Sequence, residues 1–202
     1  MTTAPPDVIE QISGASPAVA ARRRPVTRDQ SQASYDALFS PVDDSALAVA
    51  DRWLLAAFAT RLTAADETAE HYAARAREVA PERAAFVIAE AAAHAAAGPY
   101  GVYAEPGLQG ENADGPRYAP GDDARTALGD TLAAGLAHVH LLTYRLRETD
   151  AASHDALLDA GWSIDGIVTL SQLIAFLAFQ QRVAAGLRVL SAVGESTTGA
   201  AA

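Results

Sequence analysis

Apolar side chains recur along most of this chain at the three- and four-residue spacing of one face of an α-helix. In residues 45–62 they stand at Leu47, Val49, Trp53, Leu54, Phe58 and Leu62. A helix brings residues at that spacing onto one side, where they can be buried together. We therefore expect this segment to be a core helix and the main body of the protein to begin near Asp43.

Capping and breaking residues delimit the other elements. Gly14 and Gly161 end helical patterns, Pro81 suits the first turn of a helix, and Asp66, three residues after Thr63, completes a capping pattern. The expected helices cover residues 7–12, 27–39, 45–62, the segment from the Thr63 cap to 77, and residues 81–97, 122–145, 151–160 and 164–193. Residues 1–42 are expected to form an N-terminal arm, with residues 1–6 frayed, residues 43–192 the helical domain, and residues 193–202 a disordered tail.

The segment from Gly161 to Leu190 is the most apolar long element. Its apolar positions form two stripes, Ile167, Leu170, Ile174 and Leu177 in one, and Phe176 and Phe179 in the other. A helix that is apolar on several sides is buried on several sides, so we expect it to lie inside a larger assembly. Arg182 follows this apolar surface, either as an inward cation that binds a carboxylate substrate or as half of an intersubunit ion pair.

Glycine and proline interrupt the segment from Tyr100 to Asp123 repeatedly. A long irregular segment inside a small domain is typical of a lid, a subunit contact or a disordered excursion. A weak internal repeat is also present, because a shift of 83 residues places His71 on His154 and residues near Pro81 on those near Ile164.

Composition narrows the fold class to all-α. Half of the 202 residues are hydrophobic, aromatic residues make up only 6%, and alanine, the strongest helix former, is abundant. All 15 basic residues are arginine, and the net charge of −10 argues against nucleic acid or an anionic membrane as partner. The Arg22-Arg23-Arg24 cluster is expected to be a solvated helix end.

Other compositional features bear on location and redox chemistry. The chain has no cysteine, which excludes thiol peroxidase chemistry within it. We see no signal peptide, and the most apolar run, residues 173–179, is too short to span a bilayer. We therefore expect a cytoplasmic protein without membrane contact.

Two histidines stand four residues after a glutamate, Glu67 with His71 and Glu90 with His94. That spacing places each pair on one helix face, where a carboxylate orients an imidazole for acid–base work. Exposed ion pairs would show the same pattern, and the four side chains together could hold a divalent metal. Without a metal-site or cofactor motif, we assign neither a metal nor a cofactor.

The remaining three histidines are weaker candidates for a functional site. His138 and His140 are two residues apart on an expected helix, so we expect them to point in different directions and not to form one site. His138 is expected to be a partly buried structural residue. His154 falls in the first turn of a helix, where a neutral donor is tolerated better than a cation.

Part of the sequence resembles the carboxymuconolactone decarboxylase and alkylhydroperoxidase-D-like superfamily. The resemblance covers about residues 45–190 and is clearest in two places. One is residues 157–190, which contain LLDAGWSIDGIVTLSQLIAFLAFQQRVAAGL, and the other runs from Arg52 through His71-Tyr72 to Arg77. The resemblance implies an all-helical, duplicated bundle, here preceded by an N-terminal helical arm. It also implies assembly into homo-oligomers.

The resemblance also locates the expected chemistry. The peroxidase-like branch carries Cys-x-x-Cys-x-x-x-His, and alignment on His71 puts Ala64 and Glu67 at the cysteine positions and Arg52, beside Asp51, at an upstream glutamate. Only the histidine is kept, so peroxidase activity by that mechanism is not expected. The resemblance implies acid–base chemistry on a small lactone or carboxylate, with His71 as acid or base and Glu67 or Asp51 tuning it. The alternative is a non-catalytic structural or regulatory subunit, partnered by a Cys-containing paralogue.

Overall fold

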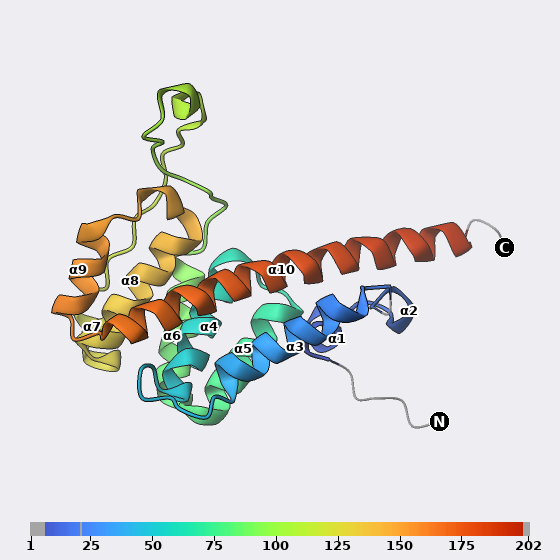
Figure 1. Cartoon of the computed structure of the whole chain (residues 1–202), viewed down its shortest axis with the longest axis horizontal. Coiled ribbons are helices and arrows are strands. Elements are labelled where there is room, and N and C mark those ends of the chain that lie inside the picture. The colour runs from blue at the N-terminus through green and yellow to red at the C-terminus, as the bar shows by residue number, and fades with distance from the viewer. Residues whose placement is uncertain (1–6, 21, 200–202) are drawn as a thin grey trace.

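The computed structural model, which describes residues 7–20 and 22–199, is built from α-helices, as the composition predicts (Figure 1). Within these residues the only extended pairing is an isolated bridge between Gly101 and Ala113. The helices are α1 Val8–Ser13, α2 Pro17–Ala20, α3 Pro25–Phe39, α4 Val49–Thr63, α5 Glu67–Val79, α6 Pro81–Ala93, α7 Asp122–Leu128, α8 Asp130–Tyr144, α9 Ala151–Asp159 and α10 Ile164–Gly199, with short 3₁₀ turns η1 Pro106–Glu111 and η2 Leu146–Glu148. The expected fraying of residues 1–6 lies outside the described residues.

Helix α4 lies at the centre of the fold. Every residue from 52 to 60 is buried, and the helix packs against α5, α6, α8 and α10. Leu54, Leu55 and Phe58 supply bulk, while alanines let neighbouring helices approach closely. The sequence predicts this helix correctly, although it begins four residues later than expected.

The α5–α6 hairpin packs along α4. Asp66 is itself the N-cap of α5, and its side chain accepts a hydrogen bond from the Ala69 amide, so the expected cap at Thr63 is wrong. Thr63 instead ends α4. Ala80 alone joins α5 to α6, and Pro81 opens α6 as predicted. Helix α6 stops at Ala93, before the cis Gly98–Pro99 bond.

The segment between α6 and α7 extends away from the helices in Figure 1 and carries η1 at its tip. Its base is fastened by Arg145, which donates to the Gly115 carbonyl at 2.9 Å and pairs with Glu148 at 2.7 Å. Glu148 also accepts from the Val102 amide. The segment is therefore anchored at its base.

The expected single helix over residues 122–145 is two helices. Gly129, at a φ of +80°, separates α7 from α8, a conformation that favours glycine. Asp150 and Ser153 form a reciprocal capping box at the start of α9. Gly161, at a φ of +94°, turns the chain into α10 as its expected role in ending α9 requires.

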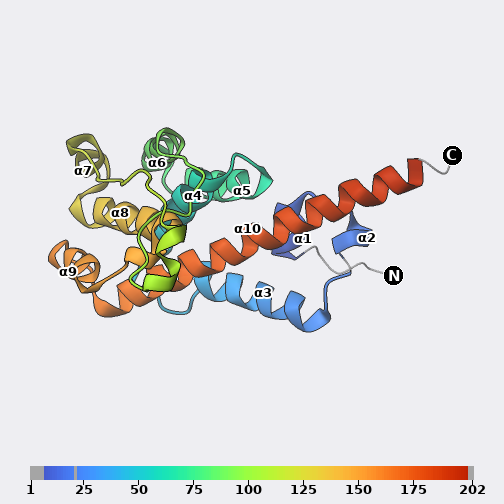
Figure 2. The same ribbon diagram turned by 90° about the horizontal axis from the view of Figure 1, so that it is seen from above.

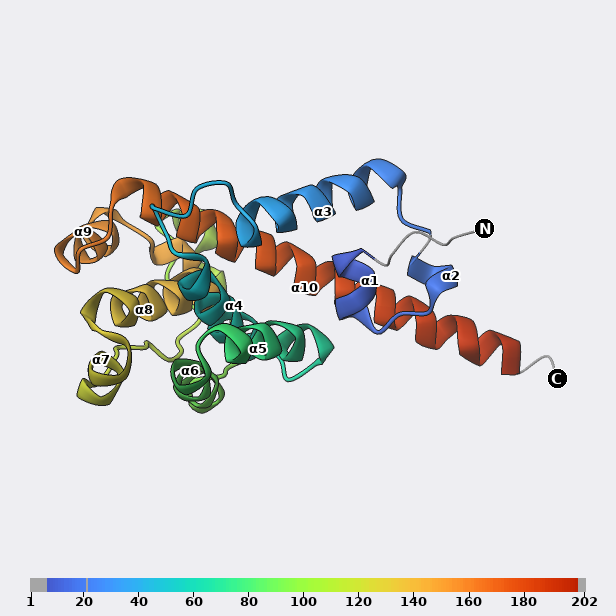
Figure 3. The ribbon, with the colours of Figure 1, turned by 90° about the horizontal axis from the view of Figure 1, so that it is seen from below.

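Helix α10 runs the length of the molecule (Figure 1) and continues to Gly199, past the expected end before Gly194. Figures 2 and 3 show α3 on one side of α10 and α4–α6 on the other. By length and composition, residues 164–193 of α10 could span a membrane, which corrects the expectation drawn from the shorter run 173–179. A third of its most apolar window is buried within the chain. The cytoplasmic location stays a prediction.

The N-terminal arm packs beside the C-terminal half of α10. Val8, Ile9 and Ile12 of α1 form a small core with Ala184 and Leu187 of α10. Asp7 caps α1 and pairs with Arg23 at 2.8 Å. The Arg23 side chain is 8% exposed, so the expectation of a solvated arginine cluster is wrong for this residue.

Candidate functional site

His71 lies on α5 and is half-buried against α3. Its Nε2 is 3.0 Å from the Tyr35 hydroxyl, and its ring adjoins a cluster of Tyr35, Phe39, Trp53 and Tyr72. Burial, followed by the charge of Arg75, lowers the pKa of His71. At neutral pH His71 is therefore an uncharged imidazole, which can accept a proton as a base but does not act as an acid.

The two carboxylates assigned to His71 have other partners. Glu67 is largely exposed and lies 3.5 Å from Arg188 of α10, while Asp51 pairs with Arg83 of α6 at 2.9 Å. No described hydrogen bond or ion pair joins either carboxylate to His71. The i, i+4 spacing does place Glu67 on the His71 side of α5, but Arg188 and Tyr35 engage the two side chains separately.

The second glutamate–histidine pair belongs to another neighbourhood. Glu90 lies 3.7 Å from His94 and accepts a hydrogen bond from the Tyr118 hydroxyl at 2.9 Å. Among residues 7–20 and 22–199, no three His, Asp or Glu side chains gather closely enough to hold a metal ion. The hairpin thus does not bring Glu67, His71, Glu90 and His94 into one metal site.

Two positions that the family resemblance aligned with redox groups, Ala64 and Arg52, stabilise the fold in this structure. Ala64 is the C-cap of α4. Arg52 is buried, and its guanidinium donates to the carbonyls of Leu47 and Leu38, both at 2.8 Å. Arg52 therefore ties the α3–α4 connection to the helix.

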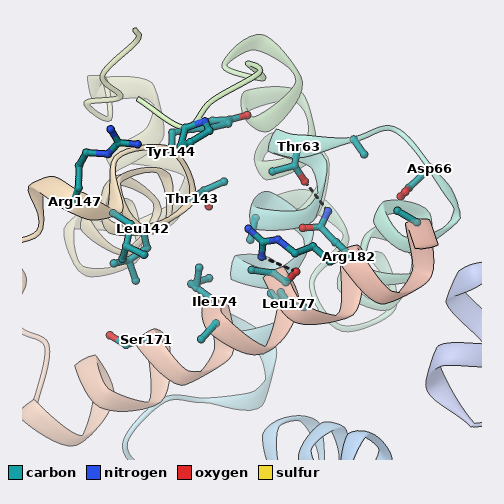
Figure 4. A pocket seen from close by; sticks show the side chains of 18 of the residues that line it. Thr63, Asp66, Leu142, Thr143, Tyr144, Arg147, Ser171, Ile174, Leu177 and Arg182 are labelled. Carbon is teal, nitrogen blue, oxygen red and sulfur yellow. Dashed lines mark hydrogen bonds between the residues drawn. The ribbon is translucent and has the colours of Figure 1, made fainter. Parts of the chain in front are cut away.

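A cavity of about 880 Å³, here called the α4–α8–α10 cavity, opens between the C-terminal ends of α4 and α8 and the middle of α10 (Figure 4). It includes Ala64. Its walls are mostly apolar and consist of Ala59, Pro99, Leu142, Leu146, Ile174, Ala175, Leu177, Ala178 and Ala185. A cavity of this size and lining accommodates an organic molecule.

Two arginines lie on opposite sides of this cavity in Figure 4. The Arg147 guanidinium lies 3.9 Å from the centre of the Tyr103 ring and donates to the Glu111 carbonyl. Arg182 donates to the Ala178 carbonyl of its own helix at 3.0 Å. Among the described side chains, neither arginine has a carboxylate partner. The sequence pattern singles out Arg182 but not Arg147, which carries no local motif.

Three more of the cavity's polar side chains are already engaged. Gln181 donates to the Thr63 hydroxyl at 2.6 Å and to the Thr60 carbonyl. Asp66 pairs with Arg188, and the Tyr144 hydroxyl donates to the Leu62 carbonyl while accepting from the Ala96 amide. The two arginines are thus the charged groups best placed to meet a ligand.

The rings of His138 and His140 lie in different surroundings, as their two-residue spacing predicts, yet both residues border a second cavity between α8 and α9. Both are buried, so the expectation of a partly buried His138 is wrong. The ring of His154 lies 5.7 Å from that of His138. The cavity extends around α8 far enough to reach two positions that do not share a helix face.

No family model matches this chain, and comparison with the curated proteins and with solved structures finds no match either.

Proposed function

We propose that this chain is a cysteine-less member of the carboxymuconolactone decarboxylase and alkylhydroperoxidase-D-like superfamily, and that it binds a small, largely apolar carboxylate in the α4–α8–α10 cavity. The observation that carries this proposal is the pair Arg147 and Arg182, which face a mostly apolar cavity without a carboxylate of their own. Guanidinium groups form strong, charge-assisted hydrogen bonds with carboxylates.

The order of the helices supports the superfamily part of the proposal. The shift of 83 residues seen in the sequence places Pro81, the start of α6, on Ile164, the start of α10. The same shift brings α4 within two residues of α8 and overlays α5 on α9. A duplicated three-helix unit accounts for this correspondence. The α4–α8–α10 cavity also includes Ala64, where the resemblance puts a redox cysteine.

The cavity favours binding over turnover. Its own carboxylate, Asp66, is held by Arg188, and His71 is not among its lining residues. Acid–base chemistry by His71 with Glu67 or Asp51 therefore stays a prediction, since a substrate in this cavity does not contact His71. Recognition of a carboxylate needs only the arginines and the apolar wall.

Octanoate is expected to bind the full-length protein, and Arg147→Gln and Arg182→Gln are each expected to weaken that binding about tenfold, because each removes a charge-assisted contact of roughly 1.5 kcal/mol. Isothermal titration calorimetry measures the affinity. Arg77→Gln, which removes an exposed arginine paired with Glu70, serves as the control and should bind like the unmodified protein. 1-Octanol, with the same tail and no charge, should be insensitive to all three changes.

The proposal fails if octanoate binding is absent or if it does not respond to either cavity arginine. Equal affinity for octanoate and 1-octanol would also contradict it, because the apolar wall alone would then account for binding.

A second candidate function, a non-catalytic subunit, is favoured by the surface of α10. Among the described residues, six large apolar side chains on one side of this helix are exposed, namely Ile164, Val168, Phe179, Val189, Leu190 and Val193. Gly186, on the same side, has nothing within 4 Å of the position of an added Cβ, so a neighbour can approach closely. We assign this stripe to a second copy of the chain, since two copies of one stripe complement each other across a two-fold axis.

Val168→Glu is expected to convert a dimer into a monomer, because the new carboxylate would be buried without a partner in the α10 contact. Sedimentation equilibrium measures the mass. Ala152→Glu, at an exposed position of α9, should leave the mass unchanged. A monomeric unmodified protein, or a Val168→Glu variant of unchanged mass, would argue against this contact.

A further inference from the structure

The exposed side of α10 carries a seven-residue repeat. Its positions follow one another at alternating distances of three and four residues, and all of them are exposed, namely Asp165, Val168, Gln172, Ala175, Phe179, Arg182 and Gly186. We call these residues the α10 seam. An alternation of three and four residues is the spacing at which two helices pack along each other as a coiled coil. The seam therefore suits contact with another helix over about six turns of α10.

Asp165 and Arg182 are the charged residues of the seam, and they lie toward its two ends. Asp165 accepts a hydrogen bond from the Thr169 hydroxyl through its backbone carbonyl, but its carboxylate has no hydrogen-bond or ion-pair partner in the described part of the chain. The Arg182 guanidinium donates to the Ala178 carbonyl of its own helix at 3.0 Å. About 25 Å of helix separates Asp165 from Arg182, so they do not pair with each other.

These two charges select the direction in which two copies of the seam can pack. In a parallel two-fold pair, Asp165 would lie opposite Asp165 and Arg182 opposite Arg182, and like charges at close range repel each other. In an antiparallel two-fold pair, Asp165 of each copy can lie opposite Arg182 of the other, so the same ion pair forms twice. The two-fold arrangement that pairs the charges is therefore antiparallel.

The register that pairs the charges also matches the rest of the seam. The positions between the two charges then meet in two further pairs, Val168 with Phe179 and Gln172 with Ala175. The first pair is apolar on both sides, and in the second a small side chain leaves room for a larger one. A shift by one repeat would place the Asp165 carboxylate against Val189 or against Ala175. Burial of a carboxylate against an apolar side chain is costly, so the shifted registers are disfavoured.

We propose that two copies of this chain pack antiparallel along the α10 seam, with Asp165 of each copy bound to Arg182 of the other. This proposal rests on the dimer assigned above to the exposed stripe of α10, and it adds the direction, the register and the ion pair. Because Arg182 lines the α4–α8–α10 cavity, the second copy brings a carboxylate to the edge of that cavity. A ligand carboxylate then competes with Asp165 for Arg182, whereas Arg147 is left to the ligand.

Engineered cysteines test the direction and the register in the full-length protein, which has no cysteine of its own. Val168→Cys co-expressed with Phe179→Cys should form a disulfide-linked dimer under mild oxidation, which non-reducing gel electrophoresis detects. Neither variant alone should cross-link, because the two copies of position 168 would lie about 16 Å apart along the helices, as would those of position 179. Val168→Cys co-expressed with Gly186→Cys, which matches a register shifted by one repeat, should also stay unlinked.

Charge reversal tests the ion pair. Asp165→Arg and Arg182→Asp are each expected to raise the dissociation constant of the dimer about tenfold, because each variant places like charges opposite each other at both ends of the seam. The double variant Asp165→Arg/Arg182→Asp should return the constant to within about threefold of the original, since both ion pairs form again with exchanged signs. Sedimentation velocity measures the constant. Asp155→Arg on α9 and Arg77→Asp on α5, both at exposed positions, make the same changes in charge away from the seam and should have no effect.

The possible results distinguish this register from the dimer itself. A monomeric unmodified protein would overturn both the dimer and the register. A dimer in which Val168→Cys cross-links to itself, or cross-links better to Gly186→Cys than to Phe179→Cys, would overturn the proposed register and leave a contact through α10 in place. Failure of the double variant to recover the affinity of the dimer would overturn the ion pair between Asp165 and Arg182.

Discussion

Phe58→Ala is expected to lower the free energy of unfolding by about 3–5 kcal/mol, because it truncates a large side chain at the middle of the core. Phe58 is fully buried at the centre of α4, with the Tyr118 ring 5.5 Å away. Truncation removes apolar surface from the core and leaves a cavity that helices packed on several sides cannot close. Urea unfolding followed by far-ultraviolet circular dichroism measures the change, which corresponds to a fall in Tm of roughly 10 °C.

Val42→Ala is the matched control for Phe58→Ala. Val42 is fully exposed before α4, so its truncation should change the free energy of unfolding by less than about 0.5 kcal/mol. A Phe58→Ala loss below about 1 kcal/mol would show that α4 is not the central packing element.

The second large effect is a loss of stability in mild acid. The pKa of His138 and of His140 is about 4 in the folded protein, against an ordinary value of 6.5. Below pH 6.5 the two histidines therefore bind protons in the unfolded chain but stay unprotonated in the folded chain. The free energy of unfolding consequently falls as the pH falls toward 4. Between pH 7 and pH 5 the expected loss is about 2 kcal/mol for each histidine.

The charged and titratable groups that face these imidazoles also lower their pKa values. His154 of α9 lowers the pKa of His138 further, and His94 and Arg145 do the same for His140. Denaturant unfolding at pH 7, 6 and 5 measures the slope. The double variant His138→Leu/His140→Leu should lose most of it, whereas Val42→Ala should keep it. An unchanged slope in the double variant would mean that other groups carry the acid sensitivity.

The helices that the sequence predicts well are those with local signals. Gly14 ends α1 in a left-handed conformation, Pro81 opens α6 and Gly161 turns the chain after α9. Each signal acts through the backbone of a few neighbouring residues, so it can be recognised without knowledge of the fold. Several boundaries differ from the prediction, among them those near Gly129 and Gly194. Gly129 breaks a pattern that otherwise reads as continuous, and α10 passes Gly194 because one glycine costs a helix only about 1 kcal/mol.

The candidate sites depend on contacts between segments that are far apart in the chain. Glu67 and His71 share a helix side, as their spacing predicts, yet Arg188 engages one and Tyr35 the other. Arg147 and Arg182 face one cavity because α8 ends opposite the middle of α10. The spacing of residues along the chain predicts neither the partners of Glu67 and His71 nor the shared cavity of Arg147 and Arg182.

Residue types and their spacing were thus sufficient to predict an all-α protein with an apolar closing helix, because helix propensity and capping act within a few residues of chain. The absence of cysteine, which excludes thiol chemistry within the chain, is read directly from the sequence. The partners of each buried polar side chain were not predictable in this way. His138 and His140 line one cavity only because α9 and residues 117–120 pack around α8 from two sides. Packing of distant segments sets such neighbourhoods, since burial is shared among helices that no local pattern brings together.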